Sequence, residues 1–486
     1  MNGEIRQLEP KALWNHFADL NAVPRPSKKE EKVIAFIKSF GENLGLPNFV
    51  DEVGNVIIKK PASKGMENKT TVVLQSHLDM VHQKNSDTHF DFDREGIQMR
   101  LDGDWVKALG TTLGADNGIG VAAIMALLAS TDIPHPPIEA LFTIDEETGM
   151  TGALALKAGL LDGSILLNLD TEDDDELTIG CAGGIDVTAT GTYTASVIEN
   201  GKTFQLILKG LTGGHSGVDI HKGRANANKL MNRVLLKLTQ ETAIKIASVD
   251  GGSLRNAIPR ESIVTVVVPE NNEVSFLQLI ATYNDILKSE YSFTDPNLVL
   301  MAAPTASVTS VLSDHFQQQF LRAMYACPNG IYRMSPQIEG LVQTSNNIAK
   351  VVIKDGHWTV QCLTRSAVDT EKTDLTQSIS SAFELCGGSI FCSGNYPGWE
   401  PKKDAPIVQL MSELYKEMFQ STAHVNAIHA GLECGILGTH YPHIQMISFG
   451  PNIYGAHSPD ERVQVSSVQK FWKYLLETLL RIPDSN

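Results

Sequence analysis

Three short apolar runs near the beginning of the chain constrain its fold more than any other feature. They occupy residues 71–77 (TVVLQSH), 138–145 (IEALFTID) and 164–170 (SILLNLD). Such continuous apolar runs are typical of strands that are covered on both faces of a sheet. The apolar segment at 118–130 lies between the first two runs and is long enough for a helix that crosses over the sheet. Strands alternating with a helix in this way predict an α/β sheet.

The middle of the chain has a different pattern of elements. Two sets of strands and helices follow one another, and each predicts a small antiparallel sheet covered by helices, of the ferredoxin-like type. The first set comprises elements at 203–209, 224–239, 262–268 and 274–289. The second set comprises elements at 297–303, 315–324, 351–354, 357–365, 375–385 and 389–394. We therefore expect an α+β lid domain of two ferredoxin-like halves at residues 191–395.

The α/β pattern returns after the lid, with a helix at 407–419, a strand at 444–450 and a helix at 468–481. The simplest arrangement is a discontinuous catalytic domain into which the lid is inserted. We expect residues 1–190 and 396–486 to form that domain. The predicted fold class is thus α/β, with a mixed sheet flanked by helices, plus the inserted lid.

The charge and the hydropathy of the chain exclude several classes of partner. The formal net charge is -16, and a negative surface opposes contact with phosphate backbones, so nucleic acid is not an expected partner. No apolar run reaches the ~18 residues needed to span a bilayer, so no membrane partner is expected. The N-terminal sequence MNGEIRQLEP lacks the basic start and apolar stretch of a secretory signal. We therefore expect a cytoplasmic protein.

Side chains of types that can bind metal ions follow the strands that are predicted for the α/β domain. They are His77, Asp79, Glu146, Glu147, Asp170 and His457, together with Asp116 just before the apolar helix. In open α/β sheets, ligands bind beyond the carboxyl ends of the strands, so these side chains are expected to meet at one edge. Any one of them alone is weak evidence, because exposed acids and histidines are common. Together they form a set of nitrogen and oxygen ligands that suits Zn²⁺ or Mn²⁺.

The roles of the five ligands follow from their positions. Two cations about 3.5–4 Å apart need a carboxylate that bridges them. Asp116 precedes a helix N-terminus, where a negative charge is favoured, and is the expected bridge. His77 and Asp170 are then expected to complete one metal site. Glu147 and His457 are expected to complete the other.

Two further acids are expected to act in catalysis. Asp79 lies two residues from His77 on the same strand face, so it is expected to contact the second ring nitrogen of that histidine. Glu146 and Glu147 are adjacent, so only one of them can point at the metal ions. Glu146 is expected to take a proton from the bridging water and to deliver it to the leaving amine.

The motifs around these residues resemble those of the co-catalytic zinc metallopeptidases, the family of carboxypeptidase G, peptidase T, peptidase V and the carnosinases. The likeness is carried by SHLDMV, GADNGIG, DEETGM, NLDTE and GAHSPDE. Within that family, CAGGID, GGHSG, RNAIPRE and IHAGLECG are most similar to the bacterial aminoacyl-histidine dipeptidases, and this likeness extends over essentially the whole chain. The resemblance implies a zinc-peptidase-like catalytic domain. It also implies two Zn²⁺ per chain, for which Co²⁺ or Mn²⁺ can substitute.

The same resemblance implies four substrate-binding residues in the lid. His215 in GGHSG matches a histidine that stabilises the tetrahedral oxyanion, and Asn256 in RNAIP matches an asparagine that contacts substrate. Arg365 in LTRS matches an arginine that holds the C-terminal carboxylate of a peptide. Gly431 in HAGLECG is expected to let the substrate backbone approach closely. Glu433 in the same motif is expected either to contact the substrate or to form an internal salt bridge, and the sequence favours neither.

The function implied is that of a metallo-dipeptidase that hydrolyses unblocked dipeptides, Xaa-His dipeptides such as carnosine among them. The alternatives with the same site are a tripeptidase and an N-acyl amino acid deacylase, and only lid contacts would distinguish them. A non-catalytic metal-binding protein is disfavoured, because it has no need of the free base Glu146. The acidic run at 172–176 is either a solvated loop or an attraction for a substrate ammonium group. The expected partners are a small peptide and a second copy of the chain in a homodimer.

Overall fold

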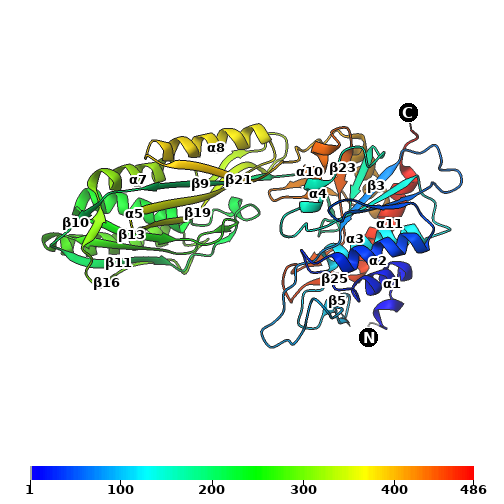
Figure 1. The fold of residues 1–486 in the computed structure, drawn as a ribbon, viewed down its shortest axis with the longest axis horizontal. Helices are drawn as coiled ribbons and strands as arrows, with labels where there is room; N and C mark the ends of the chain where they lie inside the picture. The colour runs from blue at the N-terminus through cyan, green and yellow to red at the C-terminus, as the bar shows by residue number, and fades with distance from the viewer. Residues whose placement is uncertain (1–2, 486) are drawn as a thin grey trace. The chain divides into compact units, whose positions relative to one another are not determined.

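The computed structural model describes residues 3–485, and their contacts divide the chain into two units (Figure 1). The first unit contains the chain up to Gly180, Pro401–Ala427 and the chain from Leu432 onward. The second unit contains Cys181–Glu400 and the short segment Ile428–Gly431. The unit boundaries therefore lie before the expected position 190 and after the expected position 395, because lid strands extend beyond the lid segment that the sequence pattern marks. The inclusion of Ile428–Gly431 in the second unit was not predicted.

The first unit is built around one mixed sheet. Along the sheet the strands are β1 (Asn48–Val50), β2 (Val56–Lys60), β6 (Ile138–Thr143), β3 (Val72–His77), β7 (Ile165–Asn168), β23 (Gln445–Ser448), β8 (Glu176–Cys181) and β22 (His424–Ile428). The strands β6, β3, β7 and β23 are mutually parallel, whereas β2 and β8 pair with their neighbours in antiparallel fashion. All residues of β3 and β6 are buried, as the continuous apolar runs predicted. The α/β class of this unit is thereby confirmed.

Helices cover both faces of this sheet. They are α1 (Lys11–Leu20), α2 (Glu31–Asn43), α3 (Ala115–Ala129), α4 (Thr151–Ala155), α9 (Pro406–Phe419), α10 (Glu433–His440) and α11 (Val465–Arg481). Alternate strand residues such as Val72 and Leu74 share one apolar core with α1, α2, α3, α9 and α11. The helix α3 is apolar on all sides and buried along nearly its whole length, as expected for a helix inside the core. A small sheet of β24 (Ile453–Tyr454), β25 (Arg462–Gln464), β5 (Trp105–Ala108) and β4 (Met99–Asp102) completes the unit.

The second unit is built around one long antiparallel sheet with its own apolar core. Its strands in order are β16 (Val299–Pro304), β11 (Lys202–Lys209), β15 (Ser262–Val268), β13 (Lys245–Gly251), β19 (Val342–Lys354), β20 (His357–Ser366), β9 (Gly183–Thr192) and β21 (Ser389–Tyr396), and β18 (Gly330–Met334) also pairs with β19. The helices are α5 (Ala227–Thr242), α6 (Glu273–Glu290), α7 (Asp314–Ala326) and α8 (Asp369–Glu384). Two short ribbons add β12 (Gly214–His215) with β14 (Ala257–Ile258), and β10 (Ala195–Val197) with β17 (Ser310–Leu312).

Each half of this sheet has the ferredoxin-like order, but the halves are nested rather than consecutive. The first half runs β11–α5–β13–β15–α6–β16, and its strands lie in the order β16-β11-β15-β13. The second half runs β9–α7–β19–β20–α8–β21, and its strands lie in the order β19-β20-β9-β21. The expectation that 297–303 opens the second half was therefore wrong, because this strand closes the first half. The strand that opens the second half is β9, which lies before the first half in the sequence.

None of the helices in the described part of the chain is long and apolar enough to cross a membrane.

Two helices of the second unit begin at residues whose side chains cap them. The side chain of Asn226 accepts hydrogen bonds from the backbone of Asn228 and Lys229 at the start of α5, and Ser313 caps α7 in the same way.

Candidate metal centre and lid cluster

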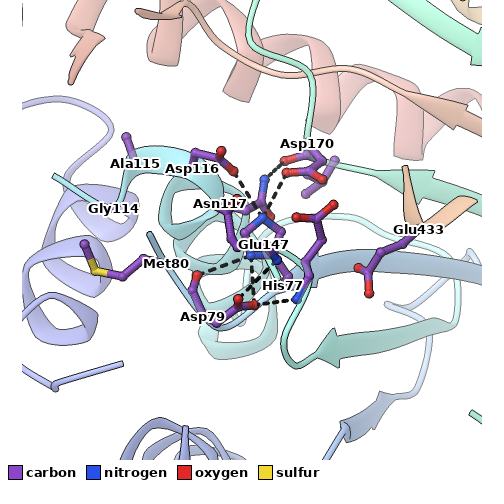
Figure 2. A network of polar contacts seen from close by, with 12 residues as sticks. His77, Asp79, Met80, Gly114, Ala115, Asp116, Asn117, Glu147, Asp170 and Glu433 are labelled. Carbon is purple, nitrogen blue, oxygen red and sulfur yellow. Dashed lines mark hydrogen bonds and ion pairs between the residues drawn. The ribbon is translucent and has the colours of Figure 1, made fainter. Parts of the chain in front are cut away.

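The seven residues predicted at the strand ends all lie in the first unit and come together at one edge of its sheet. His77 is the last residue of β3, Glu146 and Glu147 follow β6, and Asp170 follows β7. These strands are parallel, so their carboxyl ends meet at the same edge. Figure 2 shows the side chains of His77, Asp116, Glu147 and Asp170 pointing towards one another.

The ligand atoms form two groups that share one carboxylate. His77 Nε2 lies 3.1 Å from Asp116 Oδ1 and 3.5 Å from Asp170 Oδ1. His457 Nε2 lies 3.3 Å from Asp116 Oδ2 and 3.0 Å from Glu147 Oε2. Within each group the ligand atoms lie within 4.8 Å of one another. Asp116 thus directs one oxygen into each group, which is the arrangement that a bridging carboxylate requires.

The buried carboxyl groups of this cluster favour the binding of a cation. Burial raises the pKa of Glu147 to about 7, and the carboxylate of Asp116 adds to this shift. Burial also raises the pKa of Asp170. Burial opposes ionisation of Asp116 too, yet hydrogen bonds with His457 and His77 hold its pKa below the usual value. Hydrogen bonds to Asp116 and Glu147 raise the pKa of His457 to about 11.

An unpartnered atom in the same cluster supports a fit to metal. Glu147 Oε1 is buried and has no hydrogen-bond partner among the described residues. A buried carboxylate oxygen without a donor is costly, and a divalent cation would satisfy it. The donor set is made of imidazole nitrogens and carboxylate oxygens, which suits Zn²⁺ or Mn²⁺. The residues present therefore fit a pair of such ions.

Asp79 makes more contacts than the sequence predicted. Its Oδ1 lies 3.3 Å from His77 Nδ1, the ring nitrogen that faces away from Asp116. Its carboxylate also accepts hydrogen bonds from the backbone N–H groups of Glu146 at 3.0 Å and Glu147 at 3.3 Å, and from Ser27 Oγ at 2.8 Å. One fully buried side chain thus holds both the histidine of β3 and the loop that follows β6.

Glu146 differs from its neighbours because its carboxyl group is free. No described residue forms a hydrogen bond or an ion pair with this group. Burial raises the pKa of Glu146 well above its usual value, and the charges of Asp170 and Glu147 act in the same direction. The turn that carries it is fixed by Asp145, which has a φ of 52° and whose carboxylate accepts hydrogen bonds from Thr148 and Thr151. A carboxyl group that has no partner and a raised pKa is suited to act as a general base at neutral pH.

A buried polar network ties the same strand ends together. Glu433 Oε2 accepts hydrogen bonds from Gln75 Nε2 and from Thr143 Oγ1, each at 2.6 Å. Asn168 Nδ2 donates to Gln75 Oε1 at 2.5 Å, so the network reaches β3, β6 and β7. Burial raises the pKa of Glu433 to about 8. Of the two alternatives expected for Glu433, the salt bridge is not formed with any described residue, since the hydrogen-bond partners of its carboxylate are neutral.

In the second unit, His215 and Arg365 form a cluster of hydrogen-bond donors. His215 Nδ1 accepts hydrogen bonds from the backbone N–H groups of Gly217 at 3.2 Å and Val218 at 3.0 Å, which places the ring proton on Nε2. That Nε2 lies 3.4 Å from an Arg365 guanidinium nitrogen. Burial and the nearby Arg365 lower the pKa of His215 to about 4, so the ring is neutral at pH 7. Two donors therefore face each other with no acceptor between them.

Arg365 itself is buried and has no ion-pair partner among the described residues, since the nearby Asp186 pairs with Arg255. The residue is 5% exposed and forms no ion pair with any described carboxylate, while its Nε has no hydrogen-bond partner. Its other partner is Tyr396, whose hydroxyl accepts a hydrogen bond at 2.8 Å. An unpaired buried guanidinium is costly unless an anion joins it. The cluster is thus suited to a carboxylate or an oxyanion.

The other two lid residues lie beside this cluster through the backbone. The Asn256 carbonyl accepts a hydrogen bond from Ser216 N at 2.8 Å, whereas its exposed side chain has no partner in the described part of the chain. Gly431 ends the segment Ile428–Gly431, in which the His429 ring lies 2.7 Å from Ser345 Oγ. A Cβ atom on Gly217 would come within 2.1 Å of the His429 carbonyl, so this position requires glycine. His429 therefore packs against the cluster.

The acidic run after β7 is largely engaged in structural contacts. Asp174 forms an ion pair with Lys470 at 2.6 Å, and Asp175 Oδ2 lies 3.6 Å from His424 Nε2. Glu172 is different, because its carboxyl group has no partner among residues 3–485. Burial raises the pKa of Glu172, and the nearby negative charge of Asp116 adds to this shift.

The chain is similar over its whole length to known peptidases. The cytosol non-specific dipeptidase of Escherichia coli (strain K12) is 43% identical over 481 residues, which is 99% of this chain and 99% of that protein. The crystal structure of aminoacylhistidine dipeptidase from Vibrio alginolyticus matches with a TM-score of 0.93 and 46% identity, covering 100% of this chain and 99% of that chain.

Two further matches are narrower in what they show. A family model described as "Peptidase dimerisation domain" matches residues 206–295, which lie in the first half of the lid sheet. The crystal structure of aminopeptidase PepT from Bacillus cereus ATCC 10987 matches with a TM-score of 0.57 and 16% identity, covering 97% of this chain and 98% of that chain. This second likeness is one of fold alone.

Proposed function

The chain belongs to the M20 family of metallopeptidases, and from that premise we propose that it hydrolyses unblocked dipeptides at the cluster of the first unit. The observation that carries the proposal is the shared carboxylate of Asp116, which directs one oxygen to His77 and the other to His457. The site contains, in addition, the free carboxyl group of Glu146. A protein that only binds metal has no use for that free group.

Two metal ions fit the residues present. His77, Asp116 and Asp170 would hold one ion, and Asp116, Glu147 and His457 would hold the other. When bound, such ions lower the pKa of a coordinated water and polarise the carbonyl of the scissile bond. The choice of two Zn²⁺, with Co²⁺ or Mn²⁺ as substitutes, is part of the proposal.

The side chains of the chain itself perform the proton transfers. Glu146 takes a proton from the attacking water, because its carboxyl group is otherwise unengaged. It then delivers that proton to the nitrogen of the leaving amine. Asp79 keeps the proton of His77 on Nδ1 and holds the backbone of Glu146 in place, so that the base does not move during the reaction.

The lid cluster is proposed to bind the negative groups of the substrate. The guanidinium of Arg365 would form a paired hydrogen bond with the C-terminal carboxylate of the peptide. The neutral His215 would donate a hydrogen bond from its Nε2–H group to the oxyanion that develops during hydrolysis. Asn256 and Gly431 are proposed to contact the peptide backbone. The support is the unpaired state of Arg365 and the two facing donors.

The substrate range is the part of the proposal that needs a panel of peptides. We propose Xaa-His dipeptides, including carnosine, since the Vibrio alginolyticus relative is called an aminoacylhistidine dipeptidase. The Escherichia coli relative is called a non-specific dipeptidase, which favours a broader range. Initial rates with Xaa-His dipeptides, other dipeptides, tripeptides and N-acyl amino acids would decide between these ranges. Faster hydrolysis of tripeptides or N-acyl amino acids than of any dipeptide would contradict the proposal.

Assembly and location belong to the same proposal. The match of residues 206–295 to a dimerisation domain supports a homodimer, which light scattering at micromolar concentration would detect. A cytoplasmic location is supported by the name of the Escherichia coli relative. No nucleic acid or membrane partner is proposed.

A further inference from the structure

Glu461 is a buried carboxylate with an unusual set of partners. The residue is 2% exposed and forms no ion pair with any described cationic side chain. Instead it accepts hydrogen bonds from four successive backbone N–H groups. The donors are Leu113 N at 2.6 Å, Gly114 N at 3.0 Å, Ala115 N at 2.7 Å and Asp116 N at 3.3 Å. The carboxylate is therefore an internal anion bound to one turn of backbone.

This turn begins the helix α3 and carries the shared ligand Asp116. Backbone N–H groups at a helix N-terminus are unpaired within the helix and favour a negative charge. Gly114 has a φ of 71°, in the left-handed region that suits glycine, and this conformation lets the consecutive N–H groups face one carboxylate. Glu461 thus fixes the backbone of Asp116 rather than its side chain.

Glu461 also belongs to the loop that carries the second histidine. His457 precedes it by four residues, and its Nε2 lies 3.3 Å from Asp116 Oδ2 and 3.0 Å from Glu147 Oε2. The two loops are therefore joined twice, once by the ligand side chains and once by the four backbone hydrogen bonds. The second connection would persist when a metal ion replaces the first.

Arg25 holds the same turn from another direction. Its guanidinium donates to the Gly114 carbonyl at 2.5 Å, and to the carbonyls of Leu78 and Asp79 at 3.1 Å each. The residue is 1% exposed. The turn of Asp116 is thus fixed to the end of β3, which carries His77, by Arg25. It is fixed to the loop of His457 by Glu461.

We propose that Glu461 is a positioning residue that sets the distance between the two halves of the metal centre, and that it is required for the ion held by Glu147 and His457. The inference rests on the proposed metal centre of Asp116. The ion held by His77 and Asp170 depends less on Glu461, because Arg25 fixes that side. Glu461 contacts neither metal nor substrate, so it acts through Asp116 and His457.

The test measures metal binding, not activity. Metal-free Glu461→Gln protein is titrated with Zn²⁺ by calorimetry, and the bound metal is counted after dialysis. An amide has one acceptor oxygen in place of two and turns its NH₂ group towards N–H donors. We expect one ion to bind as in the wild type and the second to bind roughly 10- to 100-fold more weakly. Asp460→Asn is the matched control, since that carboxylate is exposed and adjacent, and it should bind both ions normally.

Glu461→Asp extends the test if the glutamine variant does not fold. It keeps the charge but shortens the side chain by one methylene, so it should also weaken one ion selectively. Two ions bound at wild-type affinity by either folded variant would overturn the inference. Equal weakening of both ions, together with a lower unfolding temperature, would overturn it as well, because this indicates a purely structural role. Fewer than two ions bound by the wild type would contradict the proposed metal centre itself.

Discussion

At the scale of single residues, the acids Asp79 and Glu461 are held by hydrogen bonds beside the metal centre, whereas the carboxyl group of Glu146 is free. Asp79 and Glu461 accept several hydrogen bonds each, whereas Glu146 accepts none from the described chain. Held carboxylates position the ligands, and the free one can exchange a proton. This division assigns the chemistry to Glu146 and the geometry to the others.

Replacing the free acid should separate turnover from metal binding. In Glu146→Gln, kcat should fall by roughly 10²- to 10⁴-fold, which is the usual contribution of a general acid–base group. The metal content should stay at the wild-type level, because Glu146 is not a proposed ligand. The neighbouring variant Glu147→Gln should instead lose bound metal. Metal analysis and steady-state kinetics measure both, and wild-type turnover by Glu146→Gln would reject its role as the base.

Metal binding should release protons. In the metal-free protein His457 lies between Asp116 and Glu147, which raise its pKa to about 11, so the ring is protonated at pH 7. A histidine must lose that proton before its nitrogen can bind a metal ion. Affinity should therefore rise as the pH rises, since fewer protons compete. Calorimetric titrations in buffers of different ionisation enthalpy count the released protons, and a count of zero at pH 7 would contradict the assignment of His457 as a ligand.

Arg365 should contribute to the binding of substrate and not to the stability of the folded protein. Its buried guanidinium forms no ion pair with a described carboxylate, so Arg365→Met should leave the unfolding temperature unchanged or raise it. The KM for dipeptides should rise roughly 10- to 100-fold, because a charged hydrogen bond to substrate contributes about 1.5–3 kcal/mol. Arg255→Met is the control, since Arg255 pairs with Asp186 at 3.3 Å and donates to Thr188 at 2.6 Å. That variant should lose stability, and the reverse pattern would refute the substrate role of Arg365.

At the scale of elements, the close approach of α3 to the sheet keeps two ligands in place. A Cβ atom on Gly120 would come within 2.4 Å of Ser76 Oγ and 2.6 Å of the Leu169 carbonyl oxygen. These two residues precede His77 and Asp170. A larger residue at this position would therefore push the helix away from the ends of β3 and β7.

The Gly120→Ala variant should be less stable by roughly 1–3 kcal/mol. This loss should occur although alanine favours a helix over glycine by about 1 kcal/mol. Gly438→Ala is the control, because its Cβ would meet only the flexible end of Met446 at 2.9 Å. Denaturant unfolding of both metal-free variants measures the difference. A Gly120→Ala variant as stable as the wild type would show that the approach is not tight.

The elements also show what could be predicted from the sequence. The strands β3, β6 and β7 were predictable, because buried parallel strands consist of continuous apolar residues. The strand β9 was not predicted, because it lacks a continuous apolar run and its glycines weaken the preference of GGIDVTATGT for a strand. Glu461 and Arg25 were also missed as positioning residues. Their partners are backbone groups distant in sequence, and nothing in the identity of those backbone residues marks them.

At the scale of the whole molecule, the five proposed ligands come from five separate stretches of the first unit, and the lid segment lies in the sequence between the fourth and the fifth. The meeting of these five side chains was predictable, because each follows a recognisable strand or precedes the apolar helix. The topology of the lid was only partly predictable. Its halves have the expected ferredoxin-like order, but β13 pairs with β19 to make one sheet from nested halves. Such pairing depends on register between distant strands, which local sequence does not encode.

The account of this molecule depends on a pair of metal ions that serves dipeptide hydrolysis. Metal-free protein, prepared with a chelator, can be titrated with Zn²⁺ or Mn²⁺ while the hydrolysis of β-alanyl-histidine is followed. We predict no hydrolysis without metal, and activity that saturates as about two equivalents bind per chain. Full hydrolysis by the metal-free protein would contradict the account. So would a protein that binds two ions tightly and hydrolyses no dipeptide.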